Sequence, residues 1–139
     1  MTSGSRAILD RENRKTTINL NLYQMDHYFP EHSKAFMEAI NAIRGRPVAL
    51  LGHVRPDGDC IGSQVGLARC LRDMGFDAVC YNHHEVPQNC RSFVGDTPFF
   101  VDETGVDTSR VAISVDCADH KRLGPVLQEA FPEVFLNID

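Results

Sequence analysis

Short apolar runs alternate with longer segments of helical periodicity along this chain, and this alternation most constrains its fold. The runs are brief and largely lack a polar face, and they cover residues 48–52, 77–81, 111–115 and 134–138. Runs of this kind are typical of strands that are buried on both sides in a parallel sheet. Because helical segments separate them, the pattern predicts an α/β fold, a parallel β-sheet flanked by helices.

The segments between the runs have recognisable helix boundaries. We expect a first helix with Ser33 as its N-cap and with Gly45 ending it in a left-handed conformation. A second helix follows the polar turn after residue 52 and ends at Gly75. Pro125 suits the first turn of a third helix, because its fixed φ matches helical geometry and its missing N–H is not needed there.

The 139 residues suit a single domain. Residues 1–30 are polar and mostly aperiodic, so we expect a flexible tail before a domain that spans residues 31–139. Residues 82–98 contain Pro, Asn and Gly and are expected to form a loop, followed by a short strand at 99–102.

Composition excludes several classes of protein. Nineteen acidic against fourteen basic side chains give a net charge of −5, which excludes a strongly basic nucleic-acid coat protein. No apolar run approaches the roughly 20 residues that cross a bilayer, and the first residues lack the apolar core of a secretory signal. We therefore expect a cytoplasmic protein without membrane contact. The five cysteines include no CxxC pair and are expected to be small buried residues.

The polar turn after the first run concentrates groups that bind metals. His53, Asp57 and Asp59 fall within seven residues, where the carboxyl end of a strand is expected. Mixed imidazole and carboxylate ligands favour Mn²⁺, Zn²⁺ or Fe²⁺ over Ca²⁺. Gly62-Ser63 is expected to open the next helix, whose free amides favour phosphate, so Ser63 is a candidate substrate contact. Alternatively, Asp59 is a plain N-cap and His53 a buried histidine.

Two further carboxylates follow later strands. Asp116 comes directly after the run at 111–115 and should project at the same sheet edge as His53. A carboxylate there can bridge two cations roughly 3.5–4 Å apart, as in two-metal phosphoryl sites. Asp119 is expected to be a cap or turn residue, and Asp139 follows the last run.

A second polar group, Asn82-His83-His84, follows the second run. We expect it to be a polar loop. One alternative places it beside a bound nucleotide. Another adds Cys80 and Cys90 to form a zinc cluster, although their spacing fits no common zinc site.

These segments resemble the DHH phosphoesterase superfamily. The stretch His53-Val54-Arg55-Pro56-Asp57-Gly58-Asp59 matches its first motif, His-x-x-Pro-Asp-x-Asp. Asp116 in VDCAD matches the second motif, and Asn137-Ile138-Asp139 matches the start of the third, Asp-His-His. Within the superfamily, PDGD-x-x-GS and Val86-Pro87-Gln88-Asn89 are similar to the nanoRNase branch, and family II pyrophosphatases share the first motif.

The resemblance implies metal-dependent hydrolysis of short oligonucleotides and of 3′-phosphoadenosine 5′-phosphate. It implies one metal held by His53, Asp57 and Asp116, and a second held by Asp59 with Asp116 as the bridge. The catalytic residues would be Asp57, Asp59 and Asp116, with Asp139 supporting the site. The cofactor would be two Mn²⁺ ions, or Mg²⁺ or another divalent cation, and the partners would be short oligonucleotides or nucleoside bisphosphates.

The resemblance also implies an amino-terminal fragment of a DHH-type enzyme, because the substrate-binding domain and part of the second metal's ligand set fall outside these residues. One alternative is a non-catalytic half-domain that binds a metal or a nucleotide. Others are a cyclic-dinucleotide phosphodiesterase or pyrophosphatase of the same superfamily, and an α/β binding domain without metal. An incomplete sheet predicts marginal stability or self-association, and a homodimer is the alternative to a monomer.

Overall fold

The computed structural model describes residues 29–101 and 105–139, so most of the expected tail lies outside the described residues. The chain divides into two units, Met1–Phe36 and Met37–Asp139, and the sheet belongs to the second. Helix α1, Pro30–Ala42, begins three residues before the predicted N-cap, so Ser33 lies inside it and that prediction was wrong. A proline is well suited to this first helical position. Gly45 follows the helix with a φ of 82°, as predicted.

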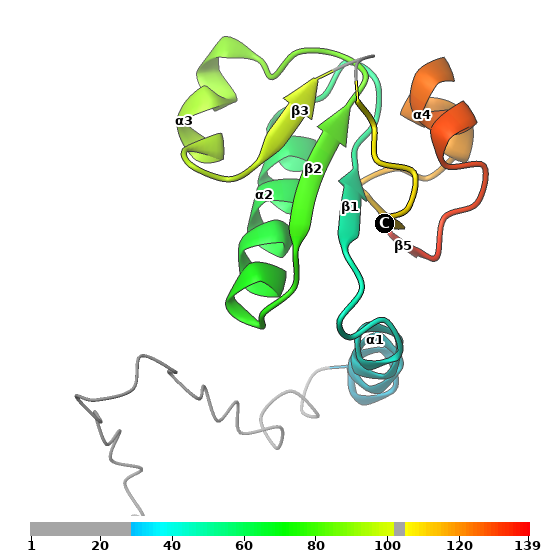
Figure 1. The fold of residues 1–139 in the computed structure, drawn as a ribbon. Coiled ribbons are helices and arrows are strands. Elements are labelled where there is room, and N and C mark those ends of the chain that lie inside the picture. Colours follow the sequence, from blue (N-terminus) through cyan, green and yellow to red (C-terminus); the bar gives the residue numbers. More distant parts are fainter. Residues whose placement is uncertain (1–28, 102–104) are drawn as a thin grey trace, which may run out of the picture. The chain divides into compact units, whose positions relative to one another are not determined.

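The sheet of the second unit has five strands, all parallel, in the order β3-β2-β1-β4-β5 (Figure 1). The strands are β1 Val48–Leu51, β2 Ala78–Asn82, β3 Phe99–Val101, β4 Val111–Val115 and β5 Leu136–Ile138. The predicted parallel α/β fold is therefore confirmed. The chain builds outward from β1 through β2 to β3 and then returns to the other side of β1 with β4 and β5.

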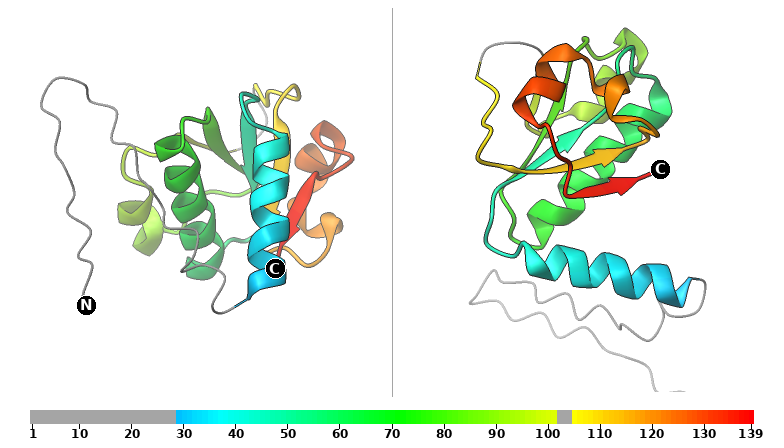
Figure 2. Two further views of the ribbon diagram at one scale, coloured as in Figure 1. Left: turned by 90° about the horizontal axis from the view of Figure 1, so that it is seen from below. Right: turned by 90° about the vertical axis from the view of Figure 1, so that its right-hand side faces the viewer.

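Helices cover both faces of this sheet (Figures 1 and 2). On one face lie α2, Gly58–Asp73, and the short α3, Arg91–Val94; on the other lie the 3₁₀ turn η3, His120–Leu123, and α4, Pro125–Ala130. Gly75 ends the turn after α2 with a φ of 90°, and Pro125 begins α4, as predicted.

The central strands are apolar on both sides because each face meets a helical layer. Every residue of β1, β2 and β4 is buried. On the α4 side the core consists of Ala49, Leu51, Val79, Tyr81, Ala112, Cys117, Leu123, Leu127 and Phe131. A smaller cluster of Ile61, Val65 and Cys90 includes residues of α2 and of the following connection. Four cysteines are buried as predicted, whereas Cys70 is exposed.

The segment 82–98 is not only a loop, as predicted, because it contains the 3₁₀ turn η2, Gln88–Cys90, and helix α3. Arg69 of α2 holds this segment through long-range contacts. Its Nη2 donates to the Phe93 carbonyl at 2.9 Å and its Nε donates to Thr97 Oγ1 at 3.0 Å. Local composition does not reveal such contacts, which explains the missed elements.

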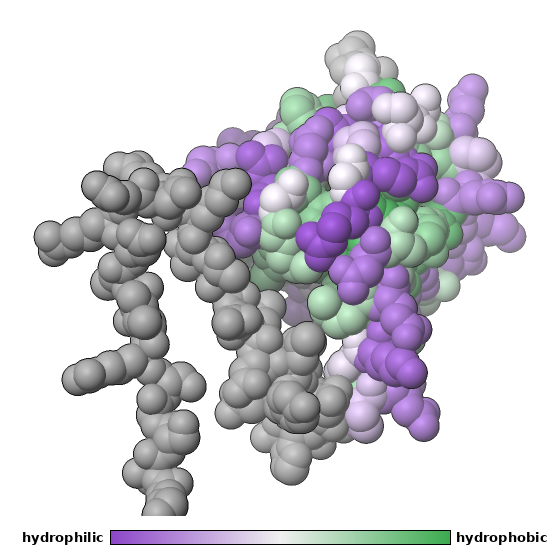
Figure 3. Space-filling view, turned by 60° about the horizontal axis from the view of Figure 1, so that its bottom comes forward, coloured by the Kyte–Doolittle hydropathy of each residue, from purple (hydrophilic) through white to green (hydrophobic). Residues whose placement is uncertain are grey.

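The surface combines polar residues with apolar areas, as the face drawn in Figure 3 illustrates. Large apolar side chains exposed among the described residues include Phe100 in β3, Phe135 just before β5 and Ile138 in β5. Both edge strands thus carry exposed apolar groups. Within residues 29–101 and 105–139, none of the helices combines the length and the apolar character of a membrane span.

Candidate metal centre

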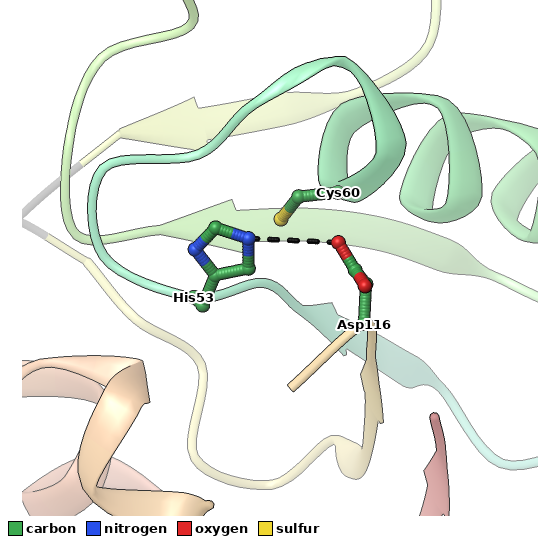
Figure 4. A group of neighbouring side chains, drawn as sticks. All are labelled: His53, Cys60 and Asp116. Carbon is green, nitrogen blue, oxygen red and sulfur yellow. Dashed lines mark ion pairs between the residues drawn. The ribbon is translucent and has the colours of Figure 1, made fainter. Parts of the chain in front are cut away.

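The register between β1 and β4 places His53 beside Asp116. Leu51 of β1 pairs with Ser114 of β4. Two residues beyond this pair, the first segment reaches His53 and the second reaches Asp116. His53 Nε2 lies 3.5 Å from Asp116 Oδ2 (Figure 4). The strand order reverses between β1 and β4, and open parallel sheets bind their ligands at such a switch point, outside the carboxyl ends of the strands.

The imidazole of His53 is oriented by its own backbone. Its Nδ1 lies 2.8 Å from the carbonyl oxygen of Val54, and since a carbonyl only accepts, Nδ1 carries the proton. In the neutral ring Nε2 is then a lone-pair acceptor, the form in which histidine binds metals. The side chain is 4% exposed, so its orientation is fixed by packing as well.

Asp57 forms the third side of this group and begins helix α2. Its Oδ1 accepts a hydrogen bond from Cys60 N at 3.0 Å and lies 3.8 Å from His53 Nε2. The hydrogen bond from Cys60 N is the main cause that lowers the pKa of Asp57 below its ordinary value, so the carboxylate is ionised at neutral pH. Asp57, and not Asp59, is the N-cap.

The predicted anion site at Gly62-Ser63 was misplaced, because α2 begins one turn earlier, at Gly58. Two amides of the first turn are already bonded, since Cys60 N donates to Asp57 Oδ1 and Ile61 N donates to the Asp57 carbonyl. Ser63 is exposed and lies inside the helix.

The loop that carries His53 is held from two directions. Val54 N donates to the Arg122 carbonyl at 2.6 Å, and Arg55 N donates to His84 Nδ1 at 2.9 Å. Arg55 and Asp116 have φ values of 53° and 49°, a left-handed conformation that costs energy for residues with a side chain. Such strain persists only where surrounding contacts impose it, and here it occurs on both strand ends of the site.

Cys60 is the site residue that the sequence analysis missed. Its Sγ, His53 Nε2 and a carboxylate oxygen of Asp116 all lie within 4.8 Å of one another, and Figure 4 shows the sulfur directed toward the other two side chains. Burial raises the pKa of this thiol to about 12. A signal existed in the sequence, because residue 60 lies in the helical turn that Asp57 caps.

Behind these ligands lies a small polar layer that requires glycine at position 52. A Cβ there would lie 2.6 Å from Cys60 Sγ and 2.7 Å from Asn82 Oδ1. Gln64 joins α2 to both neighbouring strands, since its Nε2 donates to the Leu50 carbonyl at 3.0 Å and to the Tyr81 carbonyl at 3.3 Å. The Asn82 amide is 1% exposed and has no hydrogen-bond partner within residues 29–101 and 105–139.

We call His53, Asp57, Cys60 and Asp116 the close group. The remaining candidates lie outside it. Asp59 is exposed in the first turn of α2, and Asp139 is exposed after β5. Asp116 N donates to the Ile138 carbonyl at 2.9 Å, which brings Asp139 to the same sheet edge. Asp119 is a cap, as predicted, since it accepts from Lys121 N at the start of η3.

The second polar group, Asn82-His83-His84, does not join the close group. The rings of His83 and His84 are 4.6 Å apart, and His84 Nδ1 is bonded to Arg55 N. Among the described residues these imidazoles form no metal-binding group with Cys80 and Cys90.

The donor set fits a divalent cation. Three acceptor atoms face one another here. His53 Nε2 lies 3.5 Å from Asp116 Oδ2 and 3.8 Å from Asp57 Oδ1. Acceptors in this arrangement repel one another unless a proton or a cation lies between them. Imidazole and carboxylate together match Zn²⁺, Mn²⁺ or Fe²⁺.

Two relatives of this chain carry the same name. A region of 109 residues is 29% identical to a protein of Thermus thermophilus named bifunctional oligoribonuclease and PAP phosphatase NrnA, covering 78% of this chain and 32% of the relative. A shorter stretch of 36 residues is 47% identical to the protein of the same name in Mycoplasma pneumoniae, covering 25% of this chain and 11% of that relative. The chain thus spans at most about a third of the length of these relatives.

The model of the DHH family, N-terminal domain, matches residues 47–137, which include β1, β4 and all members of the close group. Because this match covers more than half of the chain, the chain belongs to the DHH family.

Proposed function

We propose that this chain is the metal-binding part of a phosphoesterase that hydrolyses short oligonucleotides and 3′-phosphoadenosine 5′-phosphate. The observation that carries the proposal is the convergence of His53 Nε2, Asp57 and Asp116 at the switch point of the sheet. The names of the two relatives supply the substrate classes. The substrate-binding domain would lie outside residues 31–139.

The residues of the chain would share the work as follows. His53, fixed by the Val54 carbonyl, presents Nε2 to one cation together with Asp57 and Asp116. Asp116 would also hold a second cation together with Asp59, and Asp139 would support the site from the end of β5, where the Ile138 carbonyl accepts from Asp116 N. When bound, divalent cations lower the pKa of a water molecule and neutralise charge on the phosphate.

Mn²⁺ is the cofactor that we propose, with Mg²⁺ as the alternative, because oxygen-rich sites with one imidazole suit Mn²⁺. A net charge of −5 does not oppose a phosphate substrate, since two such ions add four positive charges at the site. We also propose a cytoplasmic location, where short oligonucleotides arise from RNA turnover.

Two assays test the proposal, Mn²⁺ binding on this chain and hydrolysis on the chain together with the substrate-binding domain that the proposal places outside residues 31–139. Mn²⁺ binding is measured by the loss of the free-ion electron paramagnetic resonance signal, and hydrolysis is measured on a labelled dinucleotide and on 3′-phosphoadenosine 5′-phosphate. Asp116→Asn should abolish both, whereas Asp119→Asn, a nearby cap whose amide can still accept, should change neither. Near-normal Mn²⁺ binding by Asp116→Asn would contradict the assignment.

A non-catalytic half-domain that binds a metal or a nucleotide is the second candidate, and the single group of ligand atoms that the described residues bring together, which suits one cation, favours it. It predicts that Mn²⁺ binds and is lost in Asp116→Asn, while neither substrate is hydrolysed by the wild-type chain. Hydrolysis by the chain alone would exclude it.

A further inference from the structure

A buried thiol lies where only imidazole and carboxylate ligands were expected. Cys60 Sγ, His53 Nε2 and Asp116 form a group whose ligand atoms are all within 4.8 Å of one another. Figure 4 shows that the sulfur leaves the first turn of α2 toward the space between the imidazole and the carboxylate. The three residues come from α2, from the loop after β1 and from the end of β4, so tertiary structure and not local sequence brings them together.

The position of the sulfur is imposed by its surroundings. Cys60 is 0% exposed, and its backbone N–H is bonded to Asp57 Oδ1, which fixes the turn that carries it. Gly52 leaves room for the sulfur, because a Cβ at position 52 would lie 2.6 Å from it. The thiol contacts Gln64 Oε1 at 3.7 Å, which is a weak hydrogen bond, and the backbone N–H of His53 is a further hydrogen-bond partner of the sulfur.

The thiol is poorly suited to redox chemistry or nucleophilic attack. Burial is the main cause that raises its pKa to about 12, so the free side chain is a protonated thiol at neutral pH. No other cysteine of the chain forms a disulfide with it. A coordinating thiol, in contrast, is deprotonated by the cation itself.

We propose that Cys60 Sγ is an additional ligand of the metal held by His53 and Asp116. It raises the affinity of this centre for Zn²⁺ and Co²⁺ relative to its affinity for Mn²⁺, the ion that the imidazole and carboxylates alone favour. The inference rests on the proposed metal centre and adds a ligand to it. Thiolate is a soft ligand that selects Zn²⁺ over the hard cations, which prefer oxygen.

The distances are compatible with such a centre. Ligand atoms about 2.0–2.3 Å from a tetrahedral Zn²⁺ lie about 3.4–3.8 Å from one another. His53 Nε2 and Asp116 Oδ2 already have this separation, at 3.5 Å. With the sulfur within 4.8 Å of both, an inward shift of about 1 Å completes the geometry.

Co²⁺ absorption spectroscopy on the chain tests the proposal without using activity. Thiolate coordination gives a charge-transfer band in the near ultraviolet, beside the weak visible bands of any bound Co²⁺. We expect the band in the wild type and in Cys70→Ser, an exposed cysteine on the same helix, and its loss in Cys60→Ala and Cys60→Ser. The ratio of Co²⁺ to Mn²⁺ affinity should fall at least about tenfold in both Cys60 variants.

X-ray absorption of the Zn²⁺-loaded wild type decides the question even if a Cys60 variant fails to fold. A sulfur shell at about 2.3 Å supports the proposal, and a shell of nitrogen and oxygen alone overturns it. Co²⁺ binding without the charge-transfer band also overturns it, while the metal centre stands. If the wild-type chain binds none of Co²⁺, Zn²⁺ and Mn²⁺, the proposed metal centre fails together with this inference.

Discussion

Gln64 joins α2 to the sheet beside the proposed metal centre, and its removal gives the sharpest test of how the site is built. The side chain is 0% exposed. Its Nε2 donates to the carbonyls of Leu50 and Tyr81, at the carboxyl ends of β1 and β2, and its Oε1 accepts from the Cys60 thiol. Gln64→Leu keeps nearly the same volume and removes both donors, so the change isolates the polar contacts.

The expected cost follows from these contacts. A neutral hydrogen bond contributes about 1 kcal/mol net, and a buried carbonyl left without its donor costs about 1–3 kcal/mol. The Tyr81 carbonyl also accepts from Gly52 N, at 3.4 Å, and Leu50 pairs with Cys80 in the β1–β2 ladder, so the cost is mainly that of the lost side-chain hydrogen bonds. We expect the free energy of unfolding to fall by about 2–4 kcal/mol, against a total of about 5–15 kcal/mol for a typical domain.

Urea denaturation followed by far-ultraviolet circular dichroism measures this loss. Gln128→Leu is the matched control, because its Nε2 donates to the Lys121 carbonyl at 2.8 Å on an exposed part of the surface. That variant should lose less than about 1 kcal/mol, since water can replace the lost donor. The reasoning is refuted if Gln64→Leu unfolds within about 0.5 kcal/mol of the wild type, or if the two variants lose the same amount.

Three further predictions concern the cysteines and one glycine. A thiol reagent should modify Cys70 rapidly in the native chain, and Cys70→Ser should remove this fast reaction; fast loss of a second thiol would contradict the burial of the other four. Burial raises the pKa of Cys60 and Cys80 from 9.0 to about 12, so the unfolded chain releases protons that the folded chain keeps, and stability should decline as the pH rises from 9 toward 12. The free energy of unfolding should fall by up to about 1.4 kcal/mol per pH unit for each buried thiol. Cys80→Ala should make this decline less steep, whereas Cys70→Ala should leave it unchanged. Urea titrations that give the same decline for both variants would refute this. Gly124→Ala should destabilise the fold by more than Gly45→Ala, because both glycines have a φ above 80° but only at Gly124 would the Cβ meet another side chain, His83 Cγ at 2.7 Å. His83→Gly should remove that difference, and equal losses for the two alanine variants would show that the contact relaxes freely.

Much of the fold could be predicted because its strands are buried on both faces. The fully buried β1, β2 and β4 appear in the sequence as apolar runs without a polar side. Helix α3 could not be predicted in this way, because Arg69 of α2 holds it and Thr97 after it through contacts across more than twenty residues. The start of α1 at Pro30 was predicted wrongly because Ser33 is a preferred N-cap residue, and the sequence alone does not show that the helix begins before it.

The site was predictable where its residues form a local motif or follow parallel strands, as His53 and Asp116 do, and not where they depend on how a helix packs on the sheet. His53 and Asp57 share one turn, so their proximity follows from the chain alone. Cys60 fits the apolar periodicity of α2, and a buried thiol at a core position looks like a small hydrophobic residue. Its approach to Asp116 depends on where α2 crosses the sheet, which the periodicity does not fix.

The strand order decides whether separate motifs make one site. Neighbouring strands lie about 4.8 Å apart, so a β4 strand placed beyond β3 would be three strands from β1, about 14 Å away. Asp116 would then be out of reach of His53, with every local motif unchanged. The observed order instead sets β4 against β1, in a register that carries both chains two residues past a shared pair, and the imidazole meets the carboxylate at 3.5 Å. A substitution that shifted this register by one residue would turn the side chain at the end of β4 to the other face, so the proposed metal centre needs the β1–β4 pairing as much as it needs its ligands.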